Sequence, residues 1–193
     1  MFLMQKIVCF GDSITAGWNG VQETRALTDR LERGLNCRVV NAGIPGETTR
    51  QARSRIEELI DDRANWIIIL FGSNDASYHK GIPADEFRGN LIAFIQSFHP
   101  YRVILVTPPP VIDEKQIGKR ENKHIVQYAA IVRDLANAMS LPLIDLYKIM
   151  NGRKDLINLL LDDGLHFSHD GYDLFAQHII ERINCLEENK KKA

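Results

Sequence analysis

The chain has 193 residues, of which 45% are hydrophobic and 25% are charged, and its formal net charge is -1. This length fits one globular domain, residues 1–193, that buries roughly 70% of the surface that the unfolded chain exposes. The near-neutral charge provides no broad basic surface, so neither nucleic acid nor an anionic membrane is expected as the main partner. No stretch has the length of a signal-peptide core or a membrane-spanning helix, so stable membrane insertion is not expected either.

The three cysteines favour a reducing compartment. Cys9, Cys37 and Cys185 are odd in number and form no Cys-x-x-Cys pair. A buried free thiol behaves as a small hydrophobic side chain, and such thiols persist where disulfides do not form. We therefore expect a cytoplasmic protein.

Five apolar stretches of strand length occur along the chain, with segments of helical periodicity between them. The predicted strands are residues 7–10, 39–40, 66–70, 103–106 and 141–144. The third and fourth are almost continuously apolar, which is typical of parallel strands covered on both faces. The predicted helical segments are residues 48–60, 87–98, 128–139 and about 170–186.

The first of these helical segments begins with a capping box, because Gln51 follows Thr48 by three residues. Alternation of strands and helices predicts an α/β protein, a three-layer α/β/α sandwich with a five-stranded, mainly parallel sheet of flavodoxin-like order. The longest stretches without periodicity are residues 108–119 and 151–168.

Small polar residues follow each of the first three predicted strands. They are residues 11–13 (Gly-Asp-Ser), 41–43 (Asn-Ala-Gly) and 72–75 (Gly-Ser-Asn-Asp). In a flavodoxin-like order the first strand lies between the second and third, and ligands bind beyond the carboxyl ends of the strands at this reversal point. We therefore expect the three groups to lie close together.

These groups could perform acyl transfer. The hydrolase elbow Gly-x-Ser-x-Gly does not account for Ser13, because Thr15 stands where the second glycine would be. A serine that attacks a carbonyl nevertheless needs donors for the negative charge that develops on the oxygen. The N–H groups of Ser13 and Gly43 and the side-chain amide of Asn74 could supply three such donors.

A base for the serine is predicted near the C-terminus. Asp163 and His166 are three residues apart in a glycine-containing turn before the last helix. The carboxylate could accept a hydrogen bond from one ring nitrogen, which leaves the other nitrogen to face Ser13.

The chain resembles the GDSL, or SGNH, hydrolase family, and the motifs that carry the resemblance span most of its length. The four blocks are residues 11–15 (Gly-Asp-Ser-Ile-Thr), 41–48 (Asn-Ala-Gly-Ile-Pro-Gly-Glu-Thr), 72–75 and 163–166 (Asp-Gly-Leu-His). Ile14 replaces the usual leucine, and Pro45 and Glu47 are small departures. Residues 72–76 and the Pro-Pro-Pro run at 108–110 look like the isoamyl acetate-hydrolysing esterase branch.

The resemblance implies a role for each candidate residue. Ser13 is the implied nucleophile, Gly43 and Asn74 complete the oxyanion hole with the Ser13 N–H, and Asp163 and His166 complete the triad. Each has a simpler structural reading: Ser13 as a helix cap, Asn74 as a turn residue and Gly43 as a turn glycine.

Four other residues compete for these roles, and each has a plainer interpretation. His169 lies at the start of the last helix, where capping or solvent exposure explains it. Asp162 lacks the three-residue spacing to His166. Asp145 is expected to cap the turn after the fifth strand, and Cys9 lies within a strand, away from any charge that would activate its thiol.

The sequence thus predicts a serine esterase that hydrolyses small carboxylic esters without a cofactor or metal, because no metal-ligand spacing or P-loop lysine occurs. Hydrolysis of lysophospholipids or thioesters and deacetylation of sugars stay open, as does a non-catalytic ligand-binding module of the same fold. The natural substrate and oligomeric state are also open. Trp18, Phe71, Tyr78 and His79 either line the substrate pocket or pack as ordinary loop residues.

Overall fold

Five parallel strands form the central sheet of the protein, which is described by a computed structural model covering residues 5–60 and 63–192. The strand order is β2-β1-β3-β4-β5. The strands are β1 (Lys6–Gly11), β2 (Arg38–Gly43), β3 (Trp66–Leu70), β4 (Val103–Val106) and β5 (Leu143–Ile144). Register aligns Gly11 with Gly43 and with Leu70, so the carboxyl ends of β1, β2 and β3 meet at one edge.

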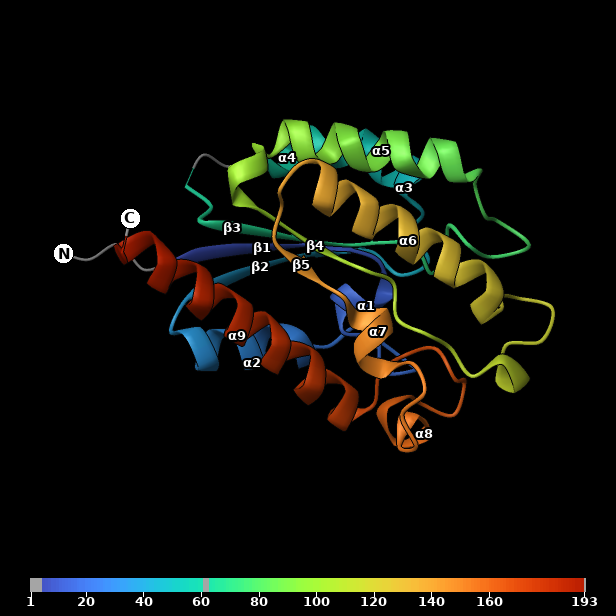
Figure 1. The fold of residues 1–193 in the computed structure, drawn as a ribbon. Coiled ribbons are helices and arrows are strands. Elements are labelled where there is room, and N and C mark those ends of the chain that lie inside the picture. The colour runs from blue at the N-terminus through green and yellow to red at the C-terminus, as the bar shows by residue number, and fades with distance from the viewer. Residues whose placement is uncertain (1–4, 61–62, 193) are drawn as a thin grey trace.

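Helices cover both faces of this sheet, as Figure 1 shows. The helices α5 and α6, with the short α3 and α4, cover one face, and α2 and α9 cover the other. The helices are α1 (Ser13–Ala16), α2 (Ala26–Leu35), α3 (Thr49–Ala52), α4 (Ile56–Leu59), α5 (Ala84–Ser97), α6 (Asn122–Ala138), α7 (Leu146–Met150), α8 (Leu156–Leu159) and α9 (His169–Lys192). Within the described part of the chain, the helices are all too short or too polar to span a bilayer.

Alternation of side chains along β1 supplies both hydrophobic cores. Val8 and Phe10 point into the core beneath α5 and α6, whereas Ile7 and Cys9 point into the core beneath α2 and α9. The Phe10 ring makes edge contacts with three further phenylalanine rings at centroid distances of 5.0 to 5.5 Å. Such buried aromatic packing fixes the strand that leads into the candidate nucleophile, Ser13.

The fold predicted from the sequence is confirmed, with local differences. The segment predicted as one helix at residues 48–60 is divided into α3, a 3-10 turn (Arg53–Arg55) and α4. Its capping box is present, and the Thr48 N–H donates to Gln51 Oε1 at 3.0 Å. The helices α1, α2, α7 and α8 lie outside the helical segments that the sequence predicted.

Candidate active site

Ser13 lies directly beyond the carboxyl end of β1. The strand ends at Gly11, where a Cβ would lie 2.5 Å from the carbonyl oxygen of Leu70, so only glycine fits beside β3. Asp12 then caps α1, because its Oδ1 accepts a hydrogen bond from the Ile14 N–H at 3.0 Å. This turn leaves Ser13 6% exposed at the edge of the sheet.

Asp163 organises the turn that holds His166. Its Oδ1 accepts hydrogen bonds from the N–H groups of Leu165 at 2.9 Å and His166 at 3.0 Å, and its Oδ2 lies 2.5 Å from His166 Nδ1. The turn requires a φ of +70° at residue 164, which glycine adopts without strain. Partial burial opposes ionisation of Asp163, but the hydrogen bonds from the His166 ring and the two N–H groups hold its pKa below the ordinary value.

The imidazole of His166 connects this turn to Ser13. His166 Nε2 lies 3.0 Å from Ser13 Oγ, although the two residues are 153 positions apart in the chain. With the Nδ1 proton directed at Asp163, Nε2 presents its lone pair to the serine hydroxyl. The structure therefore brings together the hydroxyl, imidazole and carboxylate that the sequence analysis singled out.

The predicted donor at Gly43 is already engaged elsewhere. Its N–H donates to Asn41 Oδ1 at 3.0 Å, and a Cβ at Gly43 would lie 2.3 Å from the backbone nitrogen of Ala16. Gly43 thus allows β2 to pack closely against α1. Gly46, three residues later in the same block, lines the cavity beside Ser13 instead, and in the described residues its N–H has no hydrogen-bond partner.

Asn74 is held rigidly next to Ser13. Its Nδ2 donates to the carbonyl oxygen of Glu47 at 3.1 Å and to Asp12 Oδ2 at 3.3 Å, and its Oδ1 accepts from Arg120 Nη2 at 3.5 Å. These contacts fix the plane of the amide before any ligand binds, which is what electrostatic preorganisation requires.

Two buried carboxylates join the loops around the site. Asp75 Oδ1 accepts hydrogen bonds from the N–H of Thr49 at 2.8 Å and from its hydroxyl at 2.6 Å. Burial raises the pKa of Asp75 above the ordinary value. Burial likewise raises the pKa of Asp12 from 3.8 to about 7, although the hydrogen bond from the Ile14 N–H opposes the shift.

The raised pKa of Asp12 predicts a measurable pH dependence of stability. Between pH 4 and pH 7 the unfolded chain releases this proton while the folded protein retains it, so the free energy of unfolding falls as pH rises. Asp12→Asn removes the titrating group. We expect the wild type to lose about 2–3 kcal/mol more than the variant between pH 5 and pH 8. Urea denaturation of both proteins at the two pH values measures this difference, and parallel losses would contradict it.

A cavity of about 450 Å³ opens over Ser13. Of the four residues considered for its walls, Trp18 and His79 line it. Phe71 is instead buried in the hydrophobic core, and Tyr78 packs its exposed ring against His124 at a centroid distance of 4.9 Å.

Sequence reasoning missed four polar residues in the walls of this cavity: Lys80, Gln116, Lys119 and Arg120. Three of them come from the region after β4, which shows no periodicity in the sequence. The carboxyl end of β4 opens at the same edge of the sheet as those of β1 and β3. Extending the strand-end argument from three strands to four would have pointed to this segment.

The residues that were alternatives for the catalytic roles make structural contacts or are inert. Asp145 caps α7 by accepting from the Lys148 N–H at 3.2 Å, and it forms an ion pair with Arg133 at 2.7 Å. Asp162 is fully exposed and lies 4.0 Å from Lys115 Nζ. Burial raises the pKa of the Cys9 thiol to about 12, so this thiol is inert at neutral pH.

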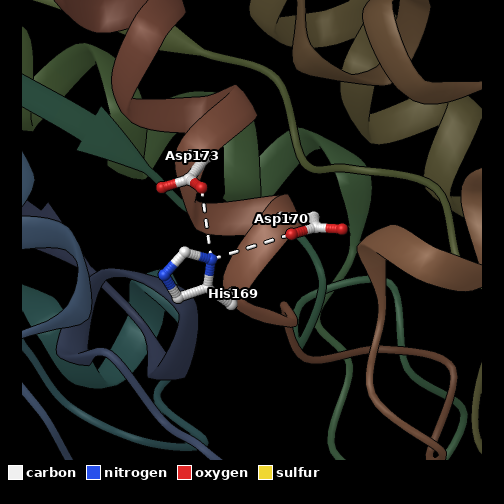
Figure 2. A group of neighbouring side chains, drawn as sticks. All are labelled: His169, Asp170 and Asp173. Atoms are coloured by element: carbon white, nitrogen blue, oxygen red, sulfur yellow. Dashed lines mark ion pairs between the residues drawn. The ribbon is translucent and has the colours of Figure 1, made fainter.

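His169 lies on the surface at the start of α9, where its Nδ1 is 3.2 Å from a carboxylate oxygen of Asp173 and 3.7 Å from one of Asp170 (Figure 2). All three side chains are exposed, and their potential ligand atoms lie within 4.8 Å of one another, a grouping that was not expected from the sequence. Asp173 also pairs with Arg30 at 2.6 Å. Ion pairing on the helix surface therefore accounts for this group.

Comparison with known proteins agrees with the geometry. Residues 9–174 match the GDSL-like lipase/acylhydrolase family. The chain is 30% identical to the isoamyl acetate-hydrolyzing esterase 1 homolog of Rattus norvegicus, over 92% of this chain and 80% of the relative. It is 26% identical to an acetylxylan esterase of Geobacillus stearothermophilus, over 93% and 94% of the two chains.

The fold is also shared with a solved structure. A lipase/acylhydrolase from Enterococcus faecalis superposes with a TM-score of 0.89 at 35% identity, over 93% of this chain and 95% of that one. The parallel sheet, the serine at its edge and the extent of these matches define a hydrolase of the three-layer α/β type. The chain belongs to the GDSL-like lipase/acylhydrolase family and is a carboxylic ester hydrolase.

Proposed function

We propose that the protein is a serine esterase in which Ser13, His166 and Asp163 form the catalytic triad. The observation that carries this proposal is the continuous line of contacts from Ser13 Oγ to His166 Nε2 at 3.0 Å and from His166 Nδ1 to Asp163 at 2.5 Å. A serine hydroxyl is a weak nucleophile unless a base of this kind removes its proton.

The reaction proceeds through an acyl-enzyme. Ser13 Oγ attacks the ester carbonyl carbon while His166 Nε2 takes the hydroxyl proton, and Asp163 stabilises the imidazolium that forms. The tetrahedral intermediate collapses as His166 gives this proton to the leaving alcohol. A water molecule then attacks the acyl-enzyme, with His166 again accepting and returning the proton, so that the acid is released and Ser13 is restored.

Three donors are assigned to the oxyanion. Ser13 N–H is at the start of α1, and Gly46 N–H takes the place that the sequence analysis gave to Gly43. Asn74 Nδ2 keeps its bond to the Glu47 carbonyl oxygen and exchanges its longer contact with Asp12 Oδ2, at 3.3 Å, for the oxyanion. The support for Gly46 is that it lines the cavity with an N–H that no group in the described residues accepts, whereas the N–H of Gly43 is bound to Asn41. Each such donor contributes about 3–4 kcal/mol to lowering the barrier.

The size of the cavity favours short esters. About 450 Å³ accommodates a small molecule, and polar side chains make up much of its wall. We therefore assign small carboxylic esters as substrates, ahead of long-chain lysophospholipids or thioesters. Deacetylation of sugars is the second candidate, because one relative is named as an acetylxylan esterase. The cytoplasmic location remains a prediction from the unpaired Cys9, Cys37 and Cys185.

A panel of p-nitrophenyl esters graded from acetate to dodecanoate tests this assignment. We expect kcat/KM to be highest for acetate to butyrate and to fall at least about tenfold by octanoate, because each further methylene must leave the cavity for solvent. Acetylated xylo-oligosaccharides, assayed by acetate release, provide the comparison for sugar esters. A maximum at octanoate or longer would contradict the small-ester assignment.

A further inference from the structure

Three cationic side chains surround the cavity that contains Ser13: Lys80, Lys119 and Arg120. Throughout residues 5–60 and 63–192, no carboxylate lies within ion-pair distance of any of them. Asp163 is the one carboxylate side chain in the same wall, and it is engaged with His166. The cavity therefore presents an excess of positive charge.

Arg120 is the most unusual of the three because it is only 5% exposed. Its Nη1 donates to Gln116 Oε1 at 2.8 Å, its Nη2 donates to Asn74 Oδ1 at 3.5 Å, and its buried Nε has no hydrogen-bond partner in the described part of the chain. A buried guanidinium normally meets a carboxylate. Arg55 illustrates this, because it forms an ion pair with Glu47.

Two carboxylates, Asp12 and Asp163, interact electrostatically with Arg120 but compensate its charge only in part. Asp12 interacts electrostatically with Arg120, but burial raises the pKa of Asp12 to about 7, so it carries less than a full charge near neutral pH. Lys80 adds a second positive charge to the cavity wall. Its Nζ is held there by a hydrogen bond that it donates to the Gly46 carbonyl oxygen at 2.7 Å. Burial and the neighbouring Arg120 both lower the pKa of Lys80, and Asp12 and Asp75 oppose this shift without cancelling it.

The contacts also place the positive charge next to the reacting carbonyl. Arg120 touches Asn74, and Lys80 touches Gly46, the two oxyanion donors proposed above. An anionic group bound here would lie within a few bonds of the scissile ester. The planar guanidinium binds carboxylate and phosphate groups through paired N–H donors.

We infer that the preferred substrates are small esters that carry a negatively charged group, a carboxylate or a phosphate, close to the scissile bond, and that Arg120, Lys80 and Lys119 bind this group. The inference rests on the proposed esterase function and narrows its substrate class. Neutral esters such as p-nitrophenyl acetate are then poor analogues that use the catalytic groups but leave the cationic wall unoccupied.

Matched pairs of esters test the inference on either side of the bond. For the alcohol side, 4-acetoxybenzoate and 4-acetoxyphenyl phosphate are compared with neutral 4-methylphenyl acetate. For the acyl side, mono-p-nitrophenyl glutarate is compared with p-nitrophenyl pentanoate. The spontaneous hydrolysis rate is subtracted for each ester. The readout is the ratio of kcat/KM for the charged ester to that for the neutral ester, compared between wild type and variants so that leaving-group reactivity cancels.

We expect this ratio, for at least one pair, to fall about tenfold or more in Arg120→Gln and about threefold in Lys80→Gln and Lys119→Gln. Lys148→Gln makes the same charge change on α7, outside the cavity wall, and should leave the ratio unchanged. If Arg120 only positioned Asn74, its loss would slow charged and neutral esters equally. Lys119 is exposed, so its variant reports on the charge even if Arg120→Gln does not fold.

The possible failures are distinguishable. If wild-type protein hydrolyses the neutral esters but every ratio is the same in the wild type and the three cavity variants, the anion inference is overturned and the esterase proposal stands. If the wild type hydrolyses none of these esters, the proposed function itself fails. The pair of esters whose kcat/KM ratio changes shows whether the bound anionic group lies on the alcohol side or the acyl side of the ester bond. The two charged alcohol-side esters show whether a carboxylate or a phosphate is preferred.

Discussion

Ser13→Ala is expected to reduce kcat for p-nitrophenyl acetate by about 10⁴-fold or more, close to complete loss of the triad. The hydroxyl removed lies 3.0 Å from His166 Nε2 and provides the atom that forms the acyl-enzyme. Stability should change little, because Ser13 is at the first position of α1, where Asp12 supplies the cap. Steady-state kinetics and a thermal melt of the purified variant measure both effects.

Ser73→Ala is a matched control for this substitution. Ser73 is also buried and lies three residues beyond the end of β3, but its hydroxyl has no hydrogen-bond partner in the described residues. Its removal should therefore leave kcat within about twofold of wild type. A fluorophosphonate should label the wild type once per chain, and the mass shift should map to the peptide that contains Ser13. Activity retained by Ser13→Ala would mean that the nucleophile lies elsewhere.

Asp163→Asn is expected to reduce kcat by about 10⁴-fold while the turn stays folded. The asparagine oxygen can still accept from the N–H groups of Leu165 and His166, which now bind Asp163 Oδ1. The amide NH₂ replaces Oδ2 opposite His166 Nδ1, however, and this favours the tautomer that carries its proton on Nε2. That tautomer cannot accept the proton of Ser13.

The neighbouring acid provides the control. Asp162→Asn makes the same chemical change one residue earlier, on a fully exposed side chain that does not contact His166. It should retain near wild-type kcat. Similar losses in the two variants would show that the local charge, rather than the orientation of His166, determines the rate.

The sheet and the residues that meet at its edge were predictable because their signals are local. Continuous apolar runs marked β3 and β4, and a small polar group after each strand marked the reactive edge. The Asp-x-x-His spacing predicted the contact between Asp163 and His166, because a turn of this length brings the Asp163 carboxylate next to the His166 ring. The pairing of His166 with Ser13 was predicted from the chemistry of a triad and from the family resemblance, because the turn at residues 163–166 does not directly follow a strand of the sheet.

The sequence did not indicate which of two glycines, Gly43 or Gly46, presents its N–H to the cavity. Gly43 and Gly46 stand in the same block, and either could present an N–H to a ligand. The register of β2 against β1 places Gly43 against α1, whereas Gly46 lines the cavity, and this placement is what supports the proposal of Gly46. Register depends on tertiary packing that a short motif does not encode.

The helix α2 and the cationic wall were missed for different reasons. In α2 only Leu27 and Leu31 are buried apolar residues, so the helical stripe is narrow and charged residues dominate the segment. The region after β4 has no repeating pattern of apolar residues. Its cavity residues Gln116, Lys119 and Arg120 could be located only from their position after the carboxyl end of β4. Lone lysines and arginines in a loop are ordinarily solvated, and only their convergence on one cavity marks Lys80, Lys119 and Arg120 as a group.

The contact between Ser13 and His166 joins the first strand to the last turn before α9, 153 positions later. During synthesis, the proposed nucleophile leaves the ribosome long before its proposed base. We therefore expect the nascent chain to hydrolyse no ester until almost all of it has emerged and α9 has packed against α2. Enzymatic turnover consequently reports on completion of the whole fold, and a fragment that stops before residue 160 should be inert even if its sheet assembles.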